Sequence, residues 1–262
     1  TLSFAIGEAD KTITVAVNGD TEVENNETFF VNLSTPSNGA ILDGQGQGTI
    51  TNEDFASLTL SNPAAQNEGT SGKVPYTFNV TLDKDMASGF TVNYSTNNVT
   101  ATTADNDYDD NDGILTFAGT AGETHTITVL ANGDTKVELD ETFTVNINSL
   151  TGPLSSSVNV SNPSATGTIT NDDQATVSLA GNVSQSEATT PQVFTVNLSN
   201  PVDVDVTLNF ATTNGTATTG DYTSVNQTVT FLAGTTTAQT VDVAISNDNI
   251  VEIDEDYNVA LS

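Results

Sequence analysis

The sequence predicts an all-β protein made of tandem immunoglobulin-like antiparallel β-sandwiches, with about seven strands in each. Alternating segments rich in Val, Thr, Ile and Phe recur along the 262 residues, bounded by Gly, Asn, Asp and Pro, and this pattern is typical of half-buried strands. No window keeps a 3.6-residue apolar rhythm, so no helix is expected. An acidic segment also recurs three times at one spacing, which indicates repeated domains.

The predicted strands follow one another with only turns between them. The clearest ones are Thr12–Val17, Thr77–Leu82, Thr126–Leu130, Val193–Leu198 and Val204–Phe210. Because half-buried strands without helices must cover one another, two packed sheets per domain are expected.

The recurring acidic segment, called the hook below, lies between two predicted strands. Its three copies are Asp20–Glu27, Asp134–Glu141 and Asp248–Glu255, and successive copies begin 114 residues apart. Each hook has an Asp, then a Glu four residues later and another Glu three residues after that. Two such carboxylates about 4 Å apart repel by roughly 4 kcal/mol at an effective dielectric of 20. Ca²⁺, which takes six to eight oxygen ligands, is the cation that suits such a cluster.

Two closing segments set the predicted domain boundaries. Gly48–Asp54 and Gly167–Asp173 are near-copies, and a new predicted strand follows each directly. The predicted units are therefore residues 1–54 (unit one), 55–174 (unit two) and 175–262 (unit three). Unit one is expected to hold the second half of a sandwich, unit two a complete sandwich, and unit three a sandwich without its last strands.

The charge balance excludes several partners. The chain has 34 acidic residues against four Lys and Arg, for a net charge of -30. Such a surface repels nucleic acid and anionic lipid. No apolar run approaches the ~20 residues of a membrane span, so no membrane insertion is expected within this chain. There is no cysteine, which leaves metal ions as the natural cross-links of a secreted array.

Further matches carry a family resemblance. They comprise an opening Glu, an Asp-Tyr pair, a Phe strand, the hook and the closing segment, and they are Asn67-Glu68-Gly69, Ser186-Glu187-Ala188, Asp107-Tyr108, Asp221-Tyr222, Leu115-Thr116-Phe117, Val229-Thr230-Phe231 and Gly167-Thr-Ile-Thr-Asn-Asp-Asp173. In this order the chain resembles tandem Calx-beta domains, known from sodium–calcium exchangers and bacterial surface proteins.

The resemblance implies a Ca²⁺ site at one end of each sandwich, at the junction with the next. The ligands it implies in unit two are Glu68, Asp107, Asp134, Glu138, Glu141, Asp172 and Asp173. Those in unit three are Glu187, Asp221, Asp248, Glu252 and Glu255. Those in unit one are Asp20, Glu24, Glu27, Glu53 and Asp54.

The chain departs from the exchanger pattern at three places. Asn52 and Asn171 stand where those domains place a further carboxylate, which predicts fewer ions. Glu53 replaces an Asp, and unit three has no closing acids within this chain.

Other uses of these residues are less well supported. Asp105–Gly113 resembles an EF-hand loop but has Asp110 where that loop needs Gly, so an acidic sandwich loop is expected, with or without an extra weakly bound ion. Paired carboxylates can serve glycosidases, but a catalytic pair has no reason to recur in every unit. His125 has no counterpart in the other units and is expected to be a strand residue. No enzyme is predicted.

The expected function is a secreted or cell-surface array of Ca²⁺-binding units in an adhesin, matrix or filament protein. Its partners would be Ca²⁺, neighbouring repeats or other copies, and glycans at its Asn-x-Ser/Thr sites. One alternative is a regulatory Ca²⁺ sensor. Another is a filament subunit that polymerises by strand exchange through incomplete end units.

Overall fold

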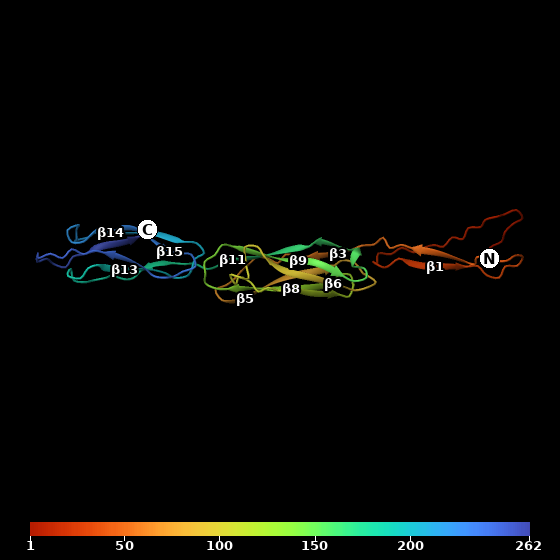
Figure 1. Ribbon diagram of the computed structural model, residues 1–262, viewed down its shortest axis with the longest axis horizontal. Helices are drawn as coiled ribbons and strands as arrows, with labels where there is room; N and C mark the ends of the chain where they lie inside the picture. The colour runs from red at the N-terminus through yellow and green to blue at the C-terminus, as the bar shows by residue number, and fades with distance from the viewer.

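Strands make up nearly all the regular structure of the protein, for which a computed structural model describes residues 1–262. The one helical element is a short 3-10 turn, Ser155–Ser157. The predicted all-β class is thus confirmed, and the chain has no helix with the length and apolar character needed to cross a membrane. The strands form three groups that lie end to end along the long axis of the molecule (Figure 1). These groups fall within the three units, whose boundaries stay a prediction.

Unit two is a two-layer sandwich. One sheet has the order β10-β3-β5-β8 and the other the order β4-β11-β9-β6-β7. The strands are β3 (Ala56–Leu60), β4 (Gln66–Asn67), β5 (Gly72–Leu82), β6 (Phe90–Asn98), β7 (Gly113–Phe117), β8 (Thr124–Gly133), β9 (Glu141–Thr151), β10 (Val158–Asn162) and β11 (Ser164–Thr170). Alternate residues face inward, so Tyr76, Phe78, Phe117 and Phe143 are fully buried between the layers.

Unit three repeats most of this arrangement. Its two sheets have the orders β12-β13-β16 and β15-β14-β17. The strands are β12 (Val177–Leu179), β13 (Gln192–Leu198), β14 (Val206–Asn214), β15 (Asn226–Phe231), β16 (Gln239–Val243) and β17 (Tyr257–Leu261). Its separate core contains Phe194, Phe210, Tyr222 and Phe231. The chain holds no counterparts of β10 and β11 after β17.

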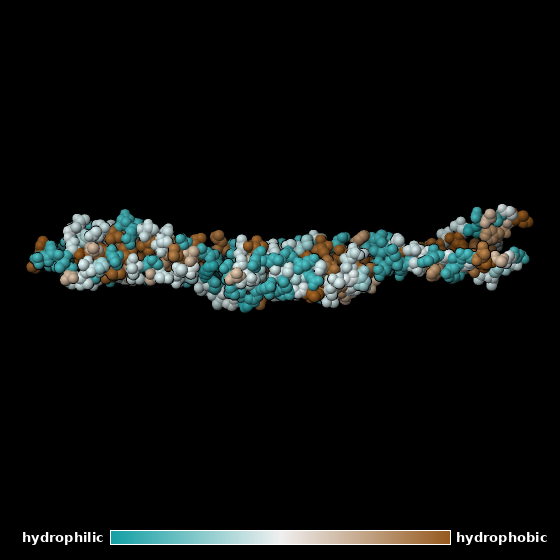
Figure 2. All heavy atoms as spheres, viewed as in Figure 1, coloured by the Kyte–Doolittle hydropathy of each residue, from teal (hydrophilic) through white to brown (hydrophobic).

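Unit one is a single antiparallel pair, β1 (Glu27–Asn32) with β2 (Gln45–Ile50). The predicted strand Thr12–Val17 is wrong, because these residues form no ladder and are exposed. Its counterpart in unit two, β8, pairs with β5, and residues 1–54 contain no strand equivalent to β5. Alternation alone therefore does not make a strand when the neighbouring strand is missing. Apolar residues are exposed over this end of the molecule (Figure 2).

The glycine of the closing segment is required by packing. Gly48 lies opposite Phe29, and Gly167 lies opposite Phe143 in the same register. A Cβ atom on either glycine would lie 2.4 Å from the Cζ atom of the facing Phe ring. The ring therefore lies across the closing strand, and the recurring Gly-Thr-Ile-Thr motif reflects this contact.

Each junction is made by the hook of one unit and a loop of the next. The Val23 N–H donates to the Asp85 carbonyl at 3.0 Å, and the Ala87 N–H donates to the Val23 carbonyl at 2.9 Å. The Val23 side chain is fully buried and belongs to the core of unit two. At the second junction Val137 makes the same pair of bonds, with Pro201 and Asp203, at 2.9 and 3.1 Å.

The Val23→Ala substitution tests this junction. The loss of two buried carbons is expected to destabilise the docking of the hook by about 1–2 kcal/mol. Hydrogen exchange at residues 83–89 should then accelerate, measured by mass spectrometry of the full chain. Val251 holds the same hook position in unit three but is almost fully exposed, so Val251→Ala should change nothing. Equal effects of the two substitutions would contradict the docking role of Val23.

Candidate metal centre

Unit two gathers its acidic side chains into two groups at the end that faces unit three. Glu68, Asp172 and Asp173 each offer a carboxylate oxygen within 4.8 Å of the others, and so do Asp107, Glu138 and Glu141. Burial and neighbouring charges, that of Glu138 among them, raise the pKa of Glu68. The structure thus brings together six of the seven acids that the resemblance implies here.

The seventh acid, Asp134, lies beside the first group. Its charge contributes to the raised pKa values of Glu68 and Asp173. Its Oδ1 atom accepts the Lys136 backbone N–H at 2.7 Å and so forms the tight turn that starts the hook. Asp134 is therefore both a neighbour of the cluster and a backbone support.

Two of these residues are buried, and one of them has a carboxylate oxygen without a partner. Glu68 is 3% exposed and Asp173 is 7% exposed. The Asp173 Oδ2 atom is buried and has no hydrogen-bond partner. Because a buried, unpaired carboxylate oxygen is costly, the arrangement calls for a cation at this place. A donor set made only of carboxylate oxygens fits a hard divalent cation.

The hook backbone is held by three successive residues. In unit two the N–H of Lys136 bonds to Asp134, the N–H of Val137 bonds to unit three, and the N–H of Glu138 donates to Asn171 Oδ1 at 3.2 Å. In unit one the same three bonds occur at the residues 114 positions earlier in the chain, Glu22, Val23 and Glu24. In the third hook only the first of these bonds occurs, from the Ile250 N–H to Asp248 Oδ1 at 2.6 Å. The Asp turn therefore belongs to the hook itself, whereas the other two bonds depend on the next unit and on the closing Asn.

Asn171 ties the hook to the closing acids, an arrangement called the Asn clasp below. Its Oδ1 atom accepts from the Glu138 N–H, and its Nδ2 atom donates to the Asp173 carbonyl at 3.2 Å. Its own N–H donates to Asp140 Oδ1 at 3.1 Å. Asn52 makes the equivalent bonds in unit one, with Glu24, Asp54 and Asn26. The amide that replaces a carboxylate at this position is therefore a structural bridge.

Unit three brings together all five of its predicted ligands. Glu187, Asp248 and Glu252 form one group within 4.8 Å, and Asp221, Glu252 and Glu255 form another. The second group is the counterpart of Asp107, Glu138 and Glu141, built again from the same positions. These acids are mostly exposed, because unit three has no closing acids beside them.

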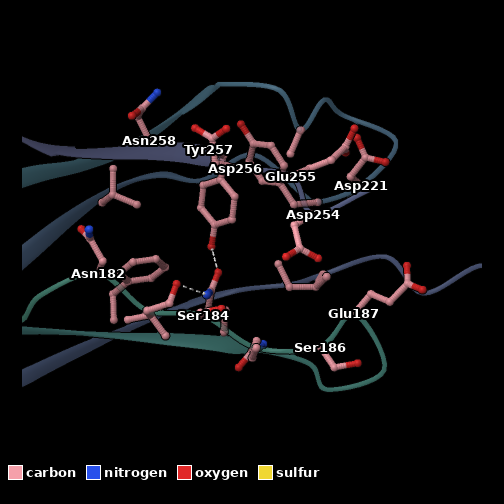
Figure 3. Close-up of a pocket in the computed structure, with 18 of the residues that line it drawn as sticks. Asn182, Ser184, Ser186, Glu187, Asp221, Asp254, Glu255, Asp256, Tyr257 and Asn258 are labelled. Atoms are coloured by element: carbon pink, nitrogen blue, oxygen red, sulfur yellow. Dashed lines mark hydrogen bonds between the residues drawn. The ribbon is translucent and has the colours of Figure 1, made fainter. Parts of the chain in front are cut away.

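A groove of about 890 Å³ adjoins these acids in unit three. Figure 3 shows Glu187, Asp221 and Glu255 at one end of it and Tyr257 in its wall, with the Tyr257 hydroxyl bonded to Gln192 Oε1. In unit two the counterpart of Tyr257 is Phe143, which β11 covers and buries fully. No strand of this chain lies across Tyr257 in that way, and the groove lies beside it.

Unit one does not assemble a group of three acids. Glu24 lies near Glu27 and Asp20, whose charges, Glu27 first, raise its pKa. Asp54 pairs with Lys84 of unit two at 3.1 Å, and Glu53 is exposed and makes no hydrogen bond. The positions equivalent to Glu68 and Asp107 do not occur in residues 1–54, so this unit supplies only part of a site.

The acidic loop Asp105–Gly113 contributes one residue to the clusters, Asp107. The Asp107 carboxylate also accepts the Thr102 N–H at 2.6 Å, which orients it. Asp110 and Asp112 bond to Thr96 and support the loop. His125 lies in β8 with its ring edge-on to Phe117.

Three contributors to this region were missed by the sequence reasoning. They are Lys136, which pairs with Glu138, Asp203 of unit three, which pairs with Lys136, and Lys84, which pairs with Asp54 across the first junction. Only the rarity of lysine in this chain could have signalled the two lysines. The repeat pattern does not indicate Asp203, because the equivalent position at the first junction is Ala87, which is not acidic.

Comparisons with known proteins found one matching family and several similar solved structures. The model of the Calx-beta domain matches residues 1–55, 51–174 and 170–262. The solved structures that resemble the chain include CBD12 from CALX1.2 (19% identity, 79% of each chain covered, TM-score 0.37) and calcium binding domain CBD12 of CALX1.1 (19%, 78% of this chain and 79% of that one, 0.35). A third is the apo-form Calx CBD1 domain (21%, 46% of this chain and 100% of that one, 0.38). No curated protein matches the chain.

The clustered carboxylates make stability without a divalent cation depend on pH. Burial and neighbouring acids raise the pKa of Glu68 to about 8, and burial together with Asp107 raises that of Glu141 to about 7. Folding therefore takes up protons, and the free energy of unfolding in EDTA should fall as pH rises from about 4.5 to about 8. Denaturant unfolding at several pH values measures this slope. Glu68→Gln should flatten it, and a stability that rises over this range would contradict the burial of these acids.

The Asn clasp predicts a second effect. Asn171→Ala leaves the Glu138 N–H without its partner and should destabilise unit two by about 1–2 kcal/mol. It should also weaken divalent-cation binding there, because the hook and the closing acids are no longer tied together. Denaturant unfolding and calorimetric titration measure the two effects. Asn52→Ala breaks the same bonds in unit one and should leave cation binding in unit two unchanged; a matching loss of affinity would argue against a local clasp.

Proposed function

Because the chain belongs to the Calx-beta domain family, we propose that it is a Ca²⁺-binding structural array whose bound ions stiffen the junctions between successive units. One of the solved structures that it resembles is named as a calcium binding domain. The donor chemistry of this chain supports the same ion, since Ca²⁺ accepts many carboxylate oxygens in flexible geometry.

The buried, unpaired Asp173 Oδ2 atom is the observation that carries the proposal. It lies in the group with Glu68 and Asp172, where burial and neighbouring charges oppose ionisation of Glu68. A bound cation removes this penalty by balancing the charges. Nearby, Asp172 accepts from the Gly69 N–H at 3.1 Å and the Asn67 amide at 3.2 Å, which orients its carboxylate beforehand.

The proposed role in stiffness follows from the shared backbone of the hook. Glu138 is a candidate ligand, and the residue before it, Val137, makes both backbone bonds to unit three. An ion that fixes Glu138 therefore also restricts Val137 and the docked loop. Rigid units with short connections then behave as one rod.

An extracellular or cell-surface location is part of the proposal. The chain has no cysteine and carries a net charge of -30, so its stability would depend on counter-ions rather than disulfides. Extracellular modules bind Ca²⁺ with dissociation constants near 10⁻⁴–10⁻³ M, and the proposed array would bind Ca²⁺ in that range. An adhesive, matrix or surface-layer array would use the resulting stiffness.

A regulatory Ca²⁺ sensor is the second candidate, favoured by the position of the acids next to a junction. A sensor changes the angle between units when the ion binds, whereas a structural array only narrows the spread of angles. Small-angle scattering of the full chain with Ca²⁺ and with EGTA separates the two, since a sensor shifts the mean particle length.

Ca²⁺ is expected to stabilise unit two through Glu138 and Glu141. At a concentration 100 times the dissociation constant, one site adds about 2.7 kcal/mol to the free energy of unfolding. Differential scanning calorimetry of the full chain with Ca²⁺ and with EGTA measures the gain, which the double variant Glu138→Gln/Glu141→Gln should lose.

Asp242 supplies the matched control for that experiment. It is exposed on β16, opposite Val193, and its side chain makes no hydrogen bond or ion pair, so Asp242→Asn should keep the full Ca²⁺-dependent gain. A wild-type chain whose unfolding is the same in Ca²⁺ and EGTA would show that the hooks are solvated acidic loops.

A further inference from the structure

Unit three reaches the acidic cluster of unit two through one loop. The two backbone bonds of Val137 hold Pro201 and Asp203 against the hook, at 2.9 and 3.1 Å. The Lys136 ammonium group pairs with Asp203 Oδ1 and also with Glu138 Oε1. One side chain thus joins a candidate ligand of unit two to an acid of unit three.

The charge of Asp203 extends to the candidate ligands. It contributes to the raised pKa values of Glu138 and Glu141, after burial, the largest cause for each. Lys136 opposes this effect at Glu138, whose pKa its hydrogen bond and charge lower. The Glu138 side chain is only 8% exposed, so water screens these charges weakly. Lys136 and any bound cation therefore compete for the same carboxylate.

The first junction shows that this pairing is not needed for docking. There the position of Lys136 is occupied by Glu22 and that of Asp203 by Ala87, yet Val23 makes the same two backbone bonds. The Lys136 pairing is thus an addition to the second junction. What this pairing adds is the charge that Lys136 and Asp203 bring to the acidic cluster.

We propose that unit three is an electrostatic part of the Ca²⁺ site of unit two. Asp203 shares the Lys136 ammonium group with Glu138 and so weakens the competition of Lys136 for that carboxylate. It also adds a negative charge beside the cluster, so the ion binds more tightly while unit three is docked. By linkage, the bound ion favours docking to the same extent. This inference rests on the proposed function, since it assigns to Asp203 and Lys136 the control of that site.

Calorimetric Ca²⁺ titration of the full chain tests the proposal. The binding events that disappear in the Glu138→Gln/Glu141→Gln double variant are assigned to unit two, and their affinity is then compared among the variants below. Asp203→Asn is expected to weaken binding there about fivefold. Lys136→Gln is expected to strengthen it, because the competing cation is gone. The Lys136→Gln/Asp203→Asn double variant should return close to wild type, and Asp242→Asn, which removes a distant charge, should not change the affinity.

A distance measurement supplies the second readout. The chain has no cysteine, so spin labels placed through Thr77→Cys and Thr228→Cys, both exposed, report the spread of positions between units two and three. Ca²⁺ should narrow this spread in the labelled wild type and do so less in Asp203→Asn. The proposal is overturned if Asp203→Asn keeps wild-type affinity and narrowing, or if Lys136→Gln weakens binding. Absence of any Ca²⁺ binding by the wild type would instead overturn the proposed function as a whole.

Discussion

The structure of this molecule depends on how it accommodates the repulsion among carboxylates at the ends of its sandwiches. In unit two, six acids form two groups of three, and within each group carboxylate oxygens lie within 4.8 Å of one another. The hydrogen bonds of the hook and the Asn clasp hold them there from the backbone side. They place the acids beforehand, so that a cation meets a prepared set of oxygens.

The same few residues also make the junction. Lys136, Val137 and Glu138 are consecutive, and their backbone N–H groups bond in turn to the hook, to the next unit and to the closing segment. In the proposed function, this shared backbone couples ion binding to the docking of the next unit.

The two junctions differ in how they use the scarce positive charges of the chain. At the first, Lys84 of the following unit pairs with the closing acid Asp54. At the second, Lys136 of the preceding hook pairs with Asp203. Both pairs are partly exposed, and each contributes little to stability by itself. The two lysines therefore give the acids at each junction a different charged neighbour.

Much of the fold and of the site could be predicted from the sequence because both repeat. The 114-residue spacing of the hooks located the acids, and the alternation of Phe78 and Val80 or of Phe194 and Val196 located the strands that bury them. The prediction failed at Thr12–Val17, where the pattern is equally good but no partner strand lies beside it.

The sequence by itself determined which acids belong to each hook, since local spacing and recurrence are properties of the chain. Only the tertiary structure decided what surrounds them. It placed Asp203 beside Glu138, showed that Asn171 bridges backbone groups, and left Asp173 Oδ2 buried without a partner. These facts depend on contacts between segments far apart in the chain. Such contacts arise from the packing of whole units, which no local pattern records.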